Sequence, residues 1–470
     1  MPTCETSRRG FLRAGLAGVG AAVAANASTA VAAPAVLKDR PPNLLLVICD
    51  QLGLDAIGAH GYPDAQTPNL DRMIRRGTTF IESHSTNPVC SPARSSLMTG
   101  RMPVETGVVS NGRPIHRSRP NLGQWFSERG YEAVYCGKWH LPGGTATPND
   151  GFRLLPSRGG FAQIDDTVLS HTCDAYIRNC SRERPFLLVA SFLQPHDICY
   201  YGNHPGLRMP AGMPYERIAD RLPQLPPNHK IRPKAPVALD RIICDWYDEQ
   251  QWRYYLYLYA RMVEMLDADV GRLLDAVEES GQADNTITLF TSDHGDGRAR
   301  HSHVAKWYPY DEAAKVPMIA CSPGHIDSGR RDTEHLVSGL DVMPTLCDFA
   351  GIRPPEGVRG NSLRPLLQGK STTWREFVSS EHHVVGRMVR SDQYKYVRYA
   401  GDPVEQLFDM KADPWETKNL YEDGRYADVL ADHRRMWFDF QRRLDVVEPT
   451  GRPARPAAPK RRTKAEGAKT

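Results

Sequence analysis

The stretch "NPVCSPARSSLMTG", residues 87–100, combines a cysteine with features that stabilise negative charge. The residue before a proline avoids the α region, so residues 87–89 are expected to be extended, and Pro92 suits the first turn of a helix that ends at Gly100. Cys90 then lies at the helix N-terminus, where free N–H groups and the helix dipole favour an anion. Arg94 follows one turn later on the same face. The stretch therefore predicts an anion pocket that contains a nucleophile.

Four further apolar runs end in polar side chains that could share this pocket. The runs are "NLLLVICD", "YEAVYCGKWH", "PFLLVASFLQPHD" and "NTITLFTSDHGDG". Continuous apolar runs of this length are typical of strands that are buried on both faces. The side chains at their ends are, in chain order, Asp50 and Gln51, Lys138 and His140, His196, and Asp293 and His294. Because ligands of open α/β sheets bind outside the carboxyl ends of the strands, we expect one shared site.

The residue types at this predicted site indicate two kinds of chemistry. Asp50 and Asp293, with Gln51 and His294 beside them, could bind a hard divalent cation, and calcium, magnesium or manganese suits such oxygen ligands better than zinc. A set of cationic or hydrogen-bonding side chains could bind an oxyanion and stabilise charge in a transition state. This set is Arg94, Lys138, His140, His196 and Lys306. The C-x-x-x-R spacing is shorter than the C-x-x-x-x-x-R loop of cysteine-dependent phosphatases, so a plain thiolate phosphatase fits poorly.

The elements that must position these residues predict an α/β fold. Helical patterns separate the strands, and the clearest has Leu266, Val270, Leu273 and Val277 on one face before a stop at Gly281. We expect a large, mostly parallel sheet between helices over residues 41–370. Period-two alternation then predicts a smaller subdomain over residues 371–446, with a four-stranded antiparallel sheet and a helix near residues 427–444. Residues 447–470 are rich in Pro, Ala, Lys and Arg and are expected to be a disordered basic tail.

The beginning of the chain predicts export. "SRRGFLRAG", residues 7–15, precedes an Ala/Gly-rich run with cleavage-like sites, so residues 1–33 resemble a twin-arginine signal, and a periplasmic or secreted protein is expected. No later segment has 18 apolar residues in a row, so we expect no stable membrane insertion. The formal net charge of +4 gives no reason to expect a nucleic-acid partner. Among the ten cysteines, Cys173 and Cys180 are the nearest candidate disulfide pair.

Taken together, these motifs resemble the type I sulfatases of the alkaline-phosphatase superfamily. "CSPARSSLMTG" resembles the signature C-[SP]-x-x-R, whose cysteine a dedicated enzyme oxidises to formylglycine. "PNLLLVICDQLG" and "LFTSDHGDG" resemble the two metal-binding stretches, and "GYEAVYCGKWHL" resembles the second signature. Later blocks continue the similarity in the same order, and the resemblance covers roughly residues 41–425. The resemblance implies an alkaline-phosphatase-like fold.

The resemblance also implies a mechanism and its partners. Cys90, as formylglycine, would hydrate to a gem-diol, one hydroxyl would attack sulfur, and the other would lose its proton and expel sulfate. The implied ligands of a calcium ion, with magnesium or manganese as alternatives, are Asp50, Gln51, the modified Cys90, Asp293 and His294. Arg94 and Lys138 would stabilise the sulfate oxygens, His140 would activate the gem-diol, and His196 and Lys306 would hold sulfate and help protonate the leaving oxygen. The implied partners are a formylglycine-generating enzyme, the twin-arginine translocase, and a sulfated small molecule or glycan.

The sequence departs from the family pattern at two positions and leaves some alternatives open. Many relatives have Asp-Asp at Asp50-Gln51 and Asn at His294, which affects the number of metal ligands. His301 and His303 lie close to Lys306 in the sequence and are candidates for substrate contact or for surface loop residues. A phosphonate monoester or phosphodiester hydrolase of the same superfamily is the first alternative function, and a non-catalytic glycan-binding relative is the second. A carbohydrate sulfate is the favoured substrate class, ahead of choline sulfate or an aryl sulfate.

Overall fold

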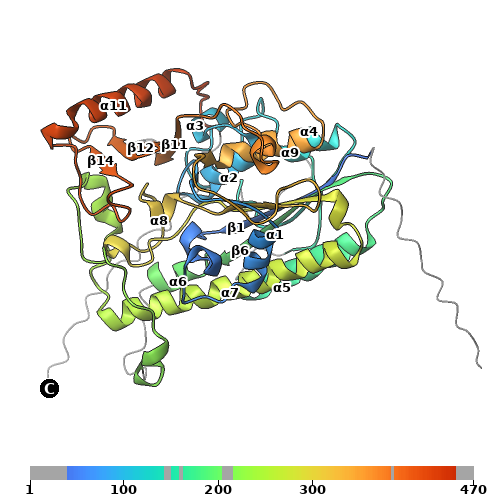
Figure 1. The fold of residues 1–470 in the computed structure, drawn as a ribbon, viewed down its shortest axis with the longest axis horizontal. Coiled ribbons are helices and arrows are strands. Elements are labelled where there is room, and N and C mark those ends of the chain that lie inside the picture. Colours follow the sequence, from blue (N-terminus) through green and yellow to red (C-terminus); the bar gives the residue numbers. More distant parts are fainter. Residues whose placement is uncertain (1–39, 142–149, 158–161, 204–214, 383–385, 451–470) are drawn as a thin grey trace, which may run out of the picture. The chain divides into compact units, whose positions relative to one another are not determined.

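The structure is a computed structural model that describes residues 40–141, 150–157, 162–203, 215–382 and 386–450 (Figure 1). The expected export signal, residues 1–33, lies outside the described residues, as does most of the expected basic tail. The described residues belong to one compact unit of the chain. Within the described part of the chain, no helix is both long enough and apolar enough to cross a membrane.

An eight-stranded sheet forms the centre of the fold. Its spatial order is β5 (Arg153–Leu154), β4 (Glu132–Gly137), β6 (Phe186–Pro195), β1 (Asn43–Asp50), β7 (Thr286–Ser292), β8 (Met318–Cys321), β2 (Gly77–Phe80) and β9 (Arg330–Asp332). Strands β5, β4, β6, β1 and β7 are parallel, and β8 runs antiparallel to both of its neighbours. Every residue of β1 is buried, which agrees with a strand covered on both faces. The predicted mixed, mostly parallel sheet is therefore confirmed.

Helices cover both faces of this sheet. Leu45, Val47 and Cys49 of β1 pack in one core cluster with helices α1 (Pro68–Arg76), α5 (Ala162–Asn179) and α7 (Glu249–Glu279). The alternate residues of β1 pack in a second cluster with α2 (Cys90–Thr99), α4 (Leu122–Ser127) and α9 (Val342–Phe349). Figure 1 shows these two helical layers below and above the sheet. Four shorter α-helices and one parallel pair of strands complete this part of the described chain. The helices are α3 (Pro103–Thr106), α6 (Ile198–Asn203), α8 (Asp311–Ala314) and α10 (Arg364–Leu367), and the strands are β3 (Ser83–His84) and β10 (Val337–Ser338).

A separate four-stranded antiparallel sheet follows, as the sequence predicts. It contains β11 (Phe377–His382), β12 (Gly386–Ser391), β13 (Tyr394–Tyr399) and β14 (Gln406–Asp409) in sequence order. Helix α11 (Ala427–Arg442) buries Leu430 against Tyr396 and Leu407 of this sheet. The backbone N–H of Glu381 on β11 donates to the carbonyl of Thr86 at 2.8 Å, which links the small sheet to the segment that leads into α2.

Helix α2 begins at Cys90 and is closed by Gly100 with φ +65°, as its sequence predicts. The left-handed conformation at a helix C-terminus suits glycine because it has no side chain to clash. Cys173 and Cys180 are both free thiols, so the candidate disulfide is not present in this structure.

Candidate active site

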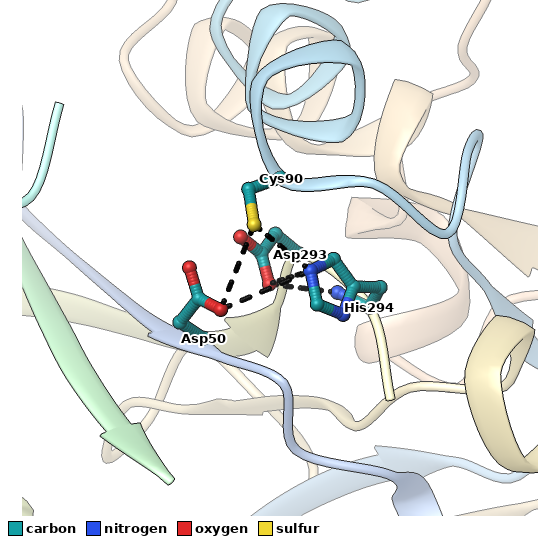
Figure 2. A group of neighbouring side chains, drawn as sticks. All are labelled: Asp50, Cys90, Asp293 and His294. Atoms are coloured by element: carbon teal, nitrogen blue, oxygen red, sulfur yellow. Dashed lines mark hydrogen bonds and ion pairs between the residues drawn. The ribbon is translucent and has the colours of Figure 1, made fainter. Parts of the chain in front are cut away.

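The carboxyl ends of the four predicted strands meet the N-terminus of α2. Asp50 ends β1 and Asp293 directly follows β7, while Cys90 is the first residue of α2. Figure 2 shows the side chains of Asp50, Cys90, Asp293 and His294 pointing toward one another. One ligand atom from each of these four buried residues lies within 4.8 Å of the others. We call these four residues the Cys90 group.

Arg94 connects the strand ends around the Cys90 group. Its Nε donates to Asp293 Oδ2 at 2.8 Å, and Nη2 donates to Asp50 Oδ2 at 3.1 Å. Its Nη1 donates to the carbonyl of Lys138 at 3.0 Å and to Ser191 Oγ at 2.7 Å. The side chain is 1% exposed. A guanidinium that is satisfied by partners in or directly after β1, β4, β6 and β7 holds these strands in one geometry.

The thiol of Cys90 lies between two nitrogen groups and a carboxylate. Lys306 Nζ and His294 Nε2 are each 3.2 Å from Sγ, and Asp50 Oδ1 is 3.8 Å away. Burial and Asp50 oppose ionisation, but Lys138, Lys306 and His294 together hold the pKa of Cys90 well below its ordinary value. For a formylglycine at this position, Sγ stands in for a hydroxyl of the hydrated aldehyde. The surroundings therefore favour an anionic atom on the side chain of residue 90.

Two lysines complete the positive charge of the site. Lys138 Nζ lies 2.5 Å from Asp50 Oδ2, and Lys306 Nζ lies 2.7 Å from Gln51 Oε1. Burial alone would raise the pKa of Asp50, but Lys138, His196, Lys306 and Arg94 together lower it well below its ordinary value. Burial and the neighbouring carboxylate of Asp50 raise the pKa of Asp293 to about 6, although His294 and Arg94 oppose the shift. The site thus combines two buried carboxylates with three cations.

Among the described residues, His196 and His140 each keep a ring nitrogen without a hydrogen-bond partner. The side chain of His196 contacts Cys90, and burial, followed by Lys306 and Lys138, lowers the pKa of His196 to about 4. The carbonyl of His140 accepts a hydrogen bond from Ser91 Oγ at 2.6 Å, which places the residue beside the start of α2. The unpartnered nitrogen is a buried Nδ1 in both residues of the described structure.

The structure does not bring His301 and His303 into the Cys90 group. His301 stacks on Tyr310 with ring centroids 4.6 Å apart, and its Nδ1 pairs with the carbonyl of Ile231 at 2.7 Å. His303 packs against Tyr308 at 4.5 Å. Substrate contact by these two histidines stays a prediction.

Some supporting residues were missed by reasoning from the sequence. Asp296 accepts a hydrogen bond from Gln51 Nε2 at 2.7 Å, and Ser191 bridges Arg94 and the carbonyl of Lys138. Tyr255 and Tyr259 on α7 donate to Asp296 and to the carbonyl of Gln51. Ser191 could have been found in the sequence, because it is a polar residue within an apolar strand. Tyr255 and Tyr259 are buried aromatic residues of α7, and such residues in a helix are typical of core packing.

The donor set fits a hard divalent cation. Asp50 and Asp293 offer carboxylate oxygens, Gln51 offers an amide oxygen, and His294 offers an imidazole nitrogen, all from residues that are at most 1% exposed. Oxygen-rich ligation with two carboxylates matches calcium or magnesium better than a thiolate-preferring metal. The adjacent cations would remain free to bind an oxyanion.

Comparisons with known proteins agree with this geometry. The family profile described as Sulfatase matches residues 42–352, and the profile described as N-sulphoglucosamine sulphohydrolase, C-terminal, matches residues 299–442. The Delta 4,5-hexuronate-2-O-sulfatase of Bacteroides thetaiotaomicron is 34% identical, with 87% of this chain and 91% of that protein covered.

Two solved structures extend the comparison. A structure described as a 2-O GAG sulfatase aligns with a TM-score of 0.75 at 32% identity over 87% of this chain and 95% of that chain. The phosphonate monoester hydrolase of Agrobacterium radiobacter aligns with a TM-score of 0.72 at 23% identity, over 85% of this chain and 95% of that chain, and this likeness supports the fold alone. The chain belongs to the sulfatase family of the alkaline-phosphatase superfamily and is a sulfuric ester hydrolase.

Proposed function

We propose that this sulfatase hydrolyses the sulfate ester of a carbohydrate, with residue 90 acting as formylglycine and with a calcium ion at the Cys90 group. The observation that carries the proposal is the position of Cys90 at the N-terminus of α2, in contact with Lys306 and His294 and next to Asp50. A carbohydrate substrate is supported by the similarity to the hexuronate-2-O-sulfatase and to the 2-O GAG sulfatase.

Formylglycine and calcium would each supply one kind of chemistry in this proposal. As formylglycine, residue 90 would supply a hydrated aldehyde whose hydroxyl is the nucleophile toward sulfur. A calcium ion held by Asp50, Gln51, Asp293 and His294 would supply positive charge that favours an anionic nucleophile and the bound sulfate group.

The side chains of the protein then bind and stabilise the sulfate group. Lys138 and Lys306 neutralise the charge on its oxygens, and Arg94 keeps Asp50 and Asp293 in place beside them. His140 would accept a proton from the hydrated aldehyde of residue 90. His196 and Lys306 hold the sulfate group, and one of them assists protonation of the leaving oxygen.

The test is sulfate release by protein produced together with a formylglycine-generating enzyme. The substrates are a 2-O-sulfated unsaturated hexuronate disaccharide, an aryl sulfate and an aryl phosphate diester. We expect sulfate release from the disaccharide, loss of activity by at least about 10³-fold in Cys90→Ala, and wild-type activity in the control Cys321→Ala, which changes a thiol on β8. Faster turnover of the aryl sulfate than of any sulfated sugar would reject the carbohydrate assignment. Dominant cleavage of the phosphate diester would move the chain to the phosphonate and phosphodiester branch.

The proposal extends to export. A formylglycine that is made in the cytosol is compatible with twin-arginine export, because that route moves folded proteins. This export would place the enzyme in the periplasm or outside the cell.

A further inference from the structure

Gln51 offers the proposed cation site an amide whose two ends have the same shape and opposite polarity. Only the oxygen can bind a cation, because the NH₂ group is purely a donor. A carboxylate at this position would need no such orientation, since both of its oxygens are ligands. The site therefore requires a feature that keeps Oε1, and not Nε2, toward the Cys90 group. This reasoning rests on the proposed function, in which Gln51 is a metal ligand.

The end of the amide that faces the Cys90 group is held by a pure donor. Lys306 Nζ donates to Gln51 Oε1 at 2.7 Å and reaches Cys90 Sγ at 3.2 Å. The thiol of Cys199 lies 3.2 Å from Oε1 and 3.1 Å from Nε2, so it does not distinguish the two ends.

The opposite end is held by a carboxylate that accepts from every one of its partners. Gln51 Nε2 donates to Asp296 Oδ2 at 2.7 Å. Tyr255 donates its hydroxyl to Asp296 Oδ1 at 2.9 Å, and the backbone N–H of Arg298 donates to the same oxygen at 2.9 Å. Asp296 is fully buried. An amide turned by half a rotation would place its oxygen against this carboxylate and its NH₂ group against the ammonium of Lys306.

The backbone of Gln51 is held in place, so the side chain cannot avoid these two partners by a backbone shift. Its N–H donates to Asp293 Oδ1 at 3.2 Å, and its carbonyl accepts from the hydroxyl of Tyr259 at 2.8 Å. Its φ of +74° lies in the left-handed region, which a non-glycine residue keeps only when its surroundings hold it there. Rotation about the side-chain bonds is therefore the main freedom left.

We propose that Asp296 is a positioning residue, which fixes the amide of Gln51 with its oxygen toward the Cys90 group. Asp296 has no hydrogen bond to any member of the Cys90 group in the described structure. It acts through Gln51, and Tyr255 in turn holds Asp296.

The first test measures calcium binding directly, by isothermal titration and by the calcium-dependent rise in the thermal midpoint of the full chain. We expect Asp296→Asn to weaken calcium binding by about 10-fold or more, because an asparagine can donate to the oxygen of Gln51 and so permits the reversed amide. The matched control is Asp267→Asn. Asp267 is also a buried carboxylate that accepts from backbone N–H groups, but it lies between α7 and α1 and should leave the calcium affinity unchanged.

The second test reverses the hydrogen-bonding roles of residues 51 and 296. In Gln51→Glu, a carboxylate oxygen faces Asp296, and adding Asp296→Asn replaces that repulsion with an N–H donor. Asp296→Asn should therefore strengthen calcium binding when it is added to Gln51→Glu, although it weakens binding in the wild-type background. An equal effect of Asp296→Asn in both backgrounds would overturn the inference and leave the proposed function intact. An absence of calcium binding by the wild-type protein would overturn both the inference and the proposed metal site.

Discussion

At the scale of single residues, the charges of the site depend on one buried guanidinium. Arg94 makes ion pairs with both Asp50 and Asp293, and it also binds Ser191 and the carbonyl of Lys138. Buried charges of this kind are stable only while all partners are present, because a lone buried charge has lost its hydration. The geometry of Arg94 thus couples catalysis to stability.

Arg94→Lys should lower both the stability of the fold and the catalytic efficiency. Lysine keeps the charge but cannot reach the partners of Arg94 in or directly after four strands at once. We expect the free energy of unfolding in urea to fall by about 3 kcal/mol and kcat/KM for a sulfate ester to fall by at least about 10²-fold. Arg435→Lys on the exposed face of α11 is the control and should change neither value. Wild-type kcat/KM in Arg94→Lys would contradict the bridging role.

Most residues of the site could be predicted from the sequence, because each follows an apolar run. Asp50, Lys138, His196 and Asp293 were expected at strand ends, and Cys90 was expected at a helix start; the structure places all five there. His301 and His303 were linked to the site only by their nearness to Lys306 in the sequence. The loop that contains them has several residues with positive φ, including His301, Ser302, Ala305 and Trp307. These turns change the direction of the chain between neighbouring residues, and no local sequence pattern predicts them.

At the scale of elements, the strand ends are held together by close backbone contact. Gly137 ends β4 with φ +105°, and a Cβ added there would overlap the carbonyl oxygen of Ser191 on β6 and the side chain of Leu169 on α5. Glycine at this position therefore sets the spacing that brings Lys138 next to Asp50.

Gly137→Ala should separate β4 from β6 and displace Lys138. We expect kcat/KM to fall by at least about 10-fold and the protein to lose about 3 kcal/mol of stability, from left-handed strain and overpacking together. Gly130→Ala is a matched control. Gly130 also has positive φ, +86°, but no atom lies within 4 Å of its added Cβ, so only the strain of about 1 kcal/mol should remain. Equal losses in the two variants, measured by urea unfolding, would contradict the account of close packing.

The elements themselves were largely predictable, but their order in the sheet was not. Continuous apolar runs identified β1, β4, β6 and β7, and the 3.6-residue period identified α7, which begins at Glu249 and continues to Glu279. The order of β8, β2 and β9 at one edge depends on crossover connections between distant segments. Strand order is a property of the assembled sheet, so local periodicity does not contain it.

At the scale of the whole molecule, the small sheet meets the large domain through a buried acid. Glu381 on β11 is fully buried, and burial raises its pKa to about 8, although Arg387 lies 3.6 Å away and opposes the shift. The folded state therefore holds a proton that the unfolded chain releases near pH 4.5. The stability that this proton supports is complete below pH 4.5 and is lost as the pH rises to 8.

Glu381→Gln should remove the pH dependence of stability that Glu381 causes. Between pH 4.5 and 8, the free energy of unfolding of the wild-type protein should fall more steeply than that of the variant, by up to about 1.4 kcal/mol per pH unit. Urea unfolding at several pH values measures the two slopes. The exposed neighbour Glu376→Gln should retain the wild-type slope. Parallel slopes for wild type and Glu381→Gln would show that Glu381 is ionised in the folded state.

Export is a second property of the whole chain. If residues 1–33 are a twin-arginine signal, replacing both Arg8 and Arg9 by Lys should retain active, modified enzyme in the cytosol. Cell fractionation with a sulfatase assay measures the distribution. Unchanged export of the double variant, or normal export when the translocase is blocked, would reject this route.

The central claim is that residue 90 is a formylglycine, and the mass of its peptide tests this claim most directly. The tryptic peptide of residues 77–94 contains Cys90, and it should be obtained from protein made together with a formylglycine-generating enzyme. The account predicts a peptide lighter by about 18 mass units than the cysteine form, the difference between a CH₂–SH and a CHO side chain, in proportion to the sulfatase activity of each preparation. A peptide with unmodified cysteine in fully active enzyme would contradict the account.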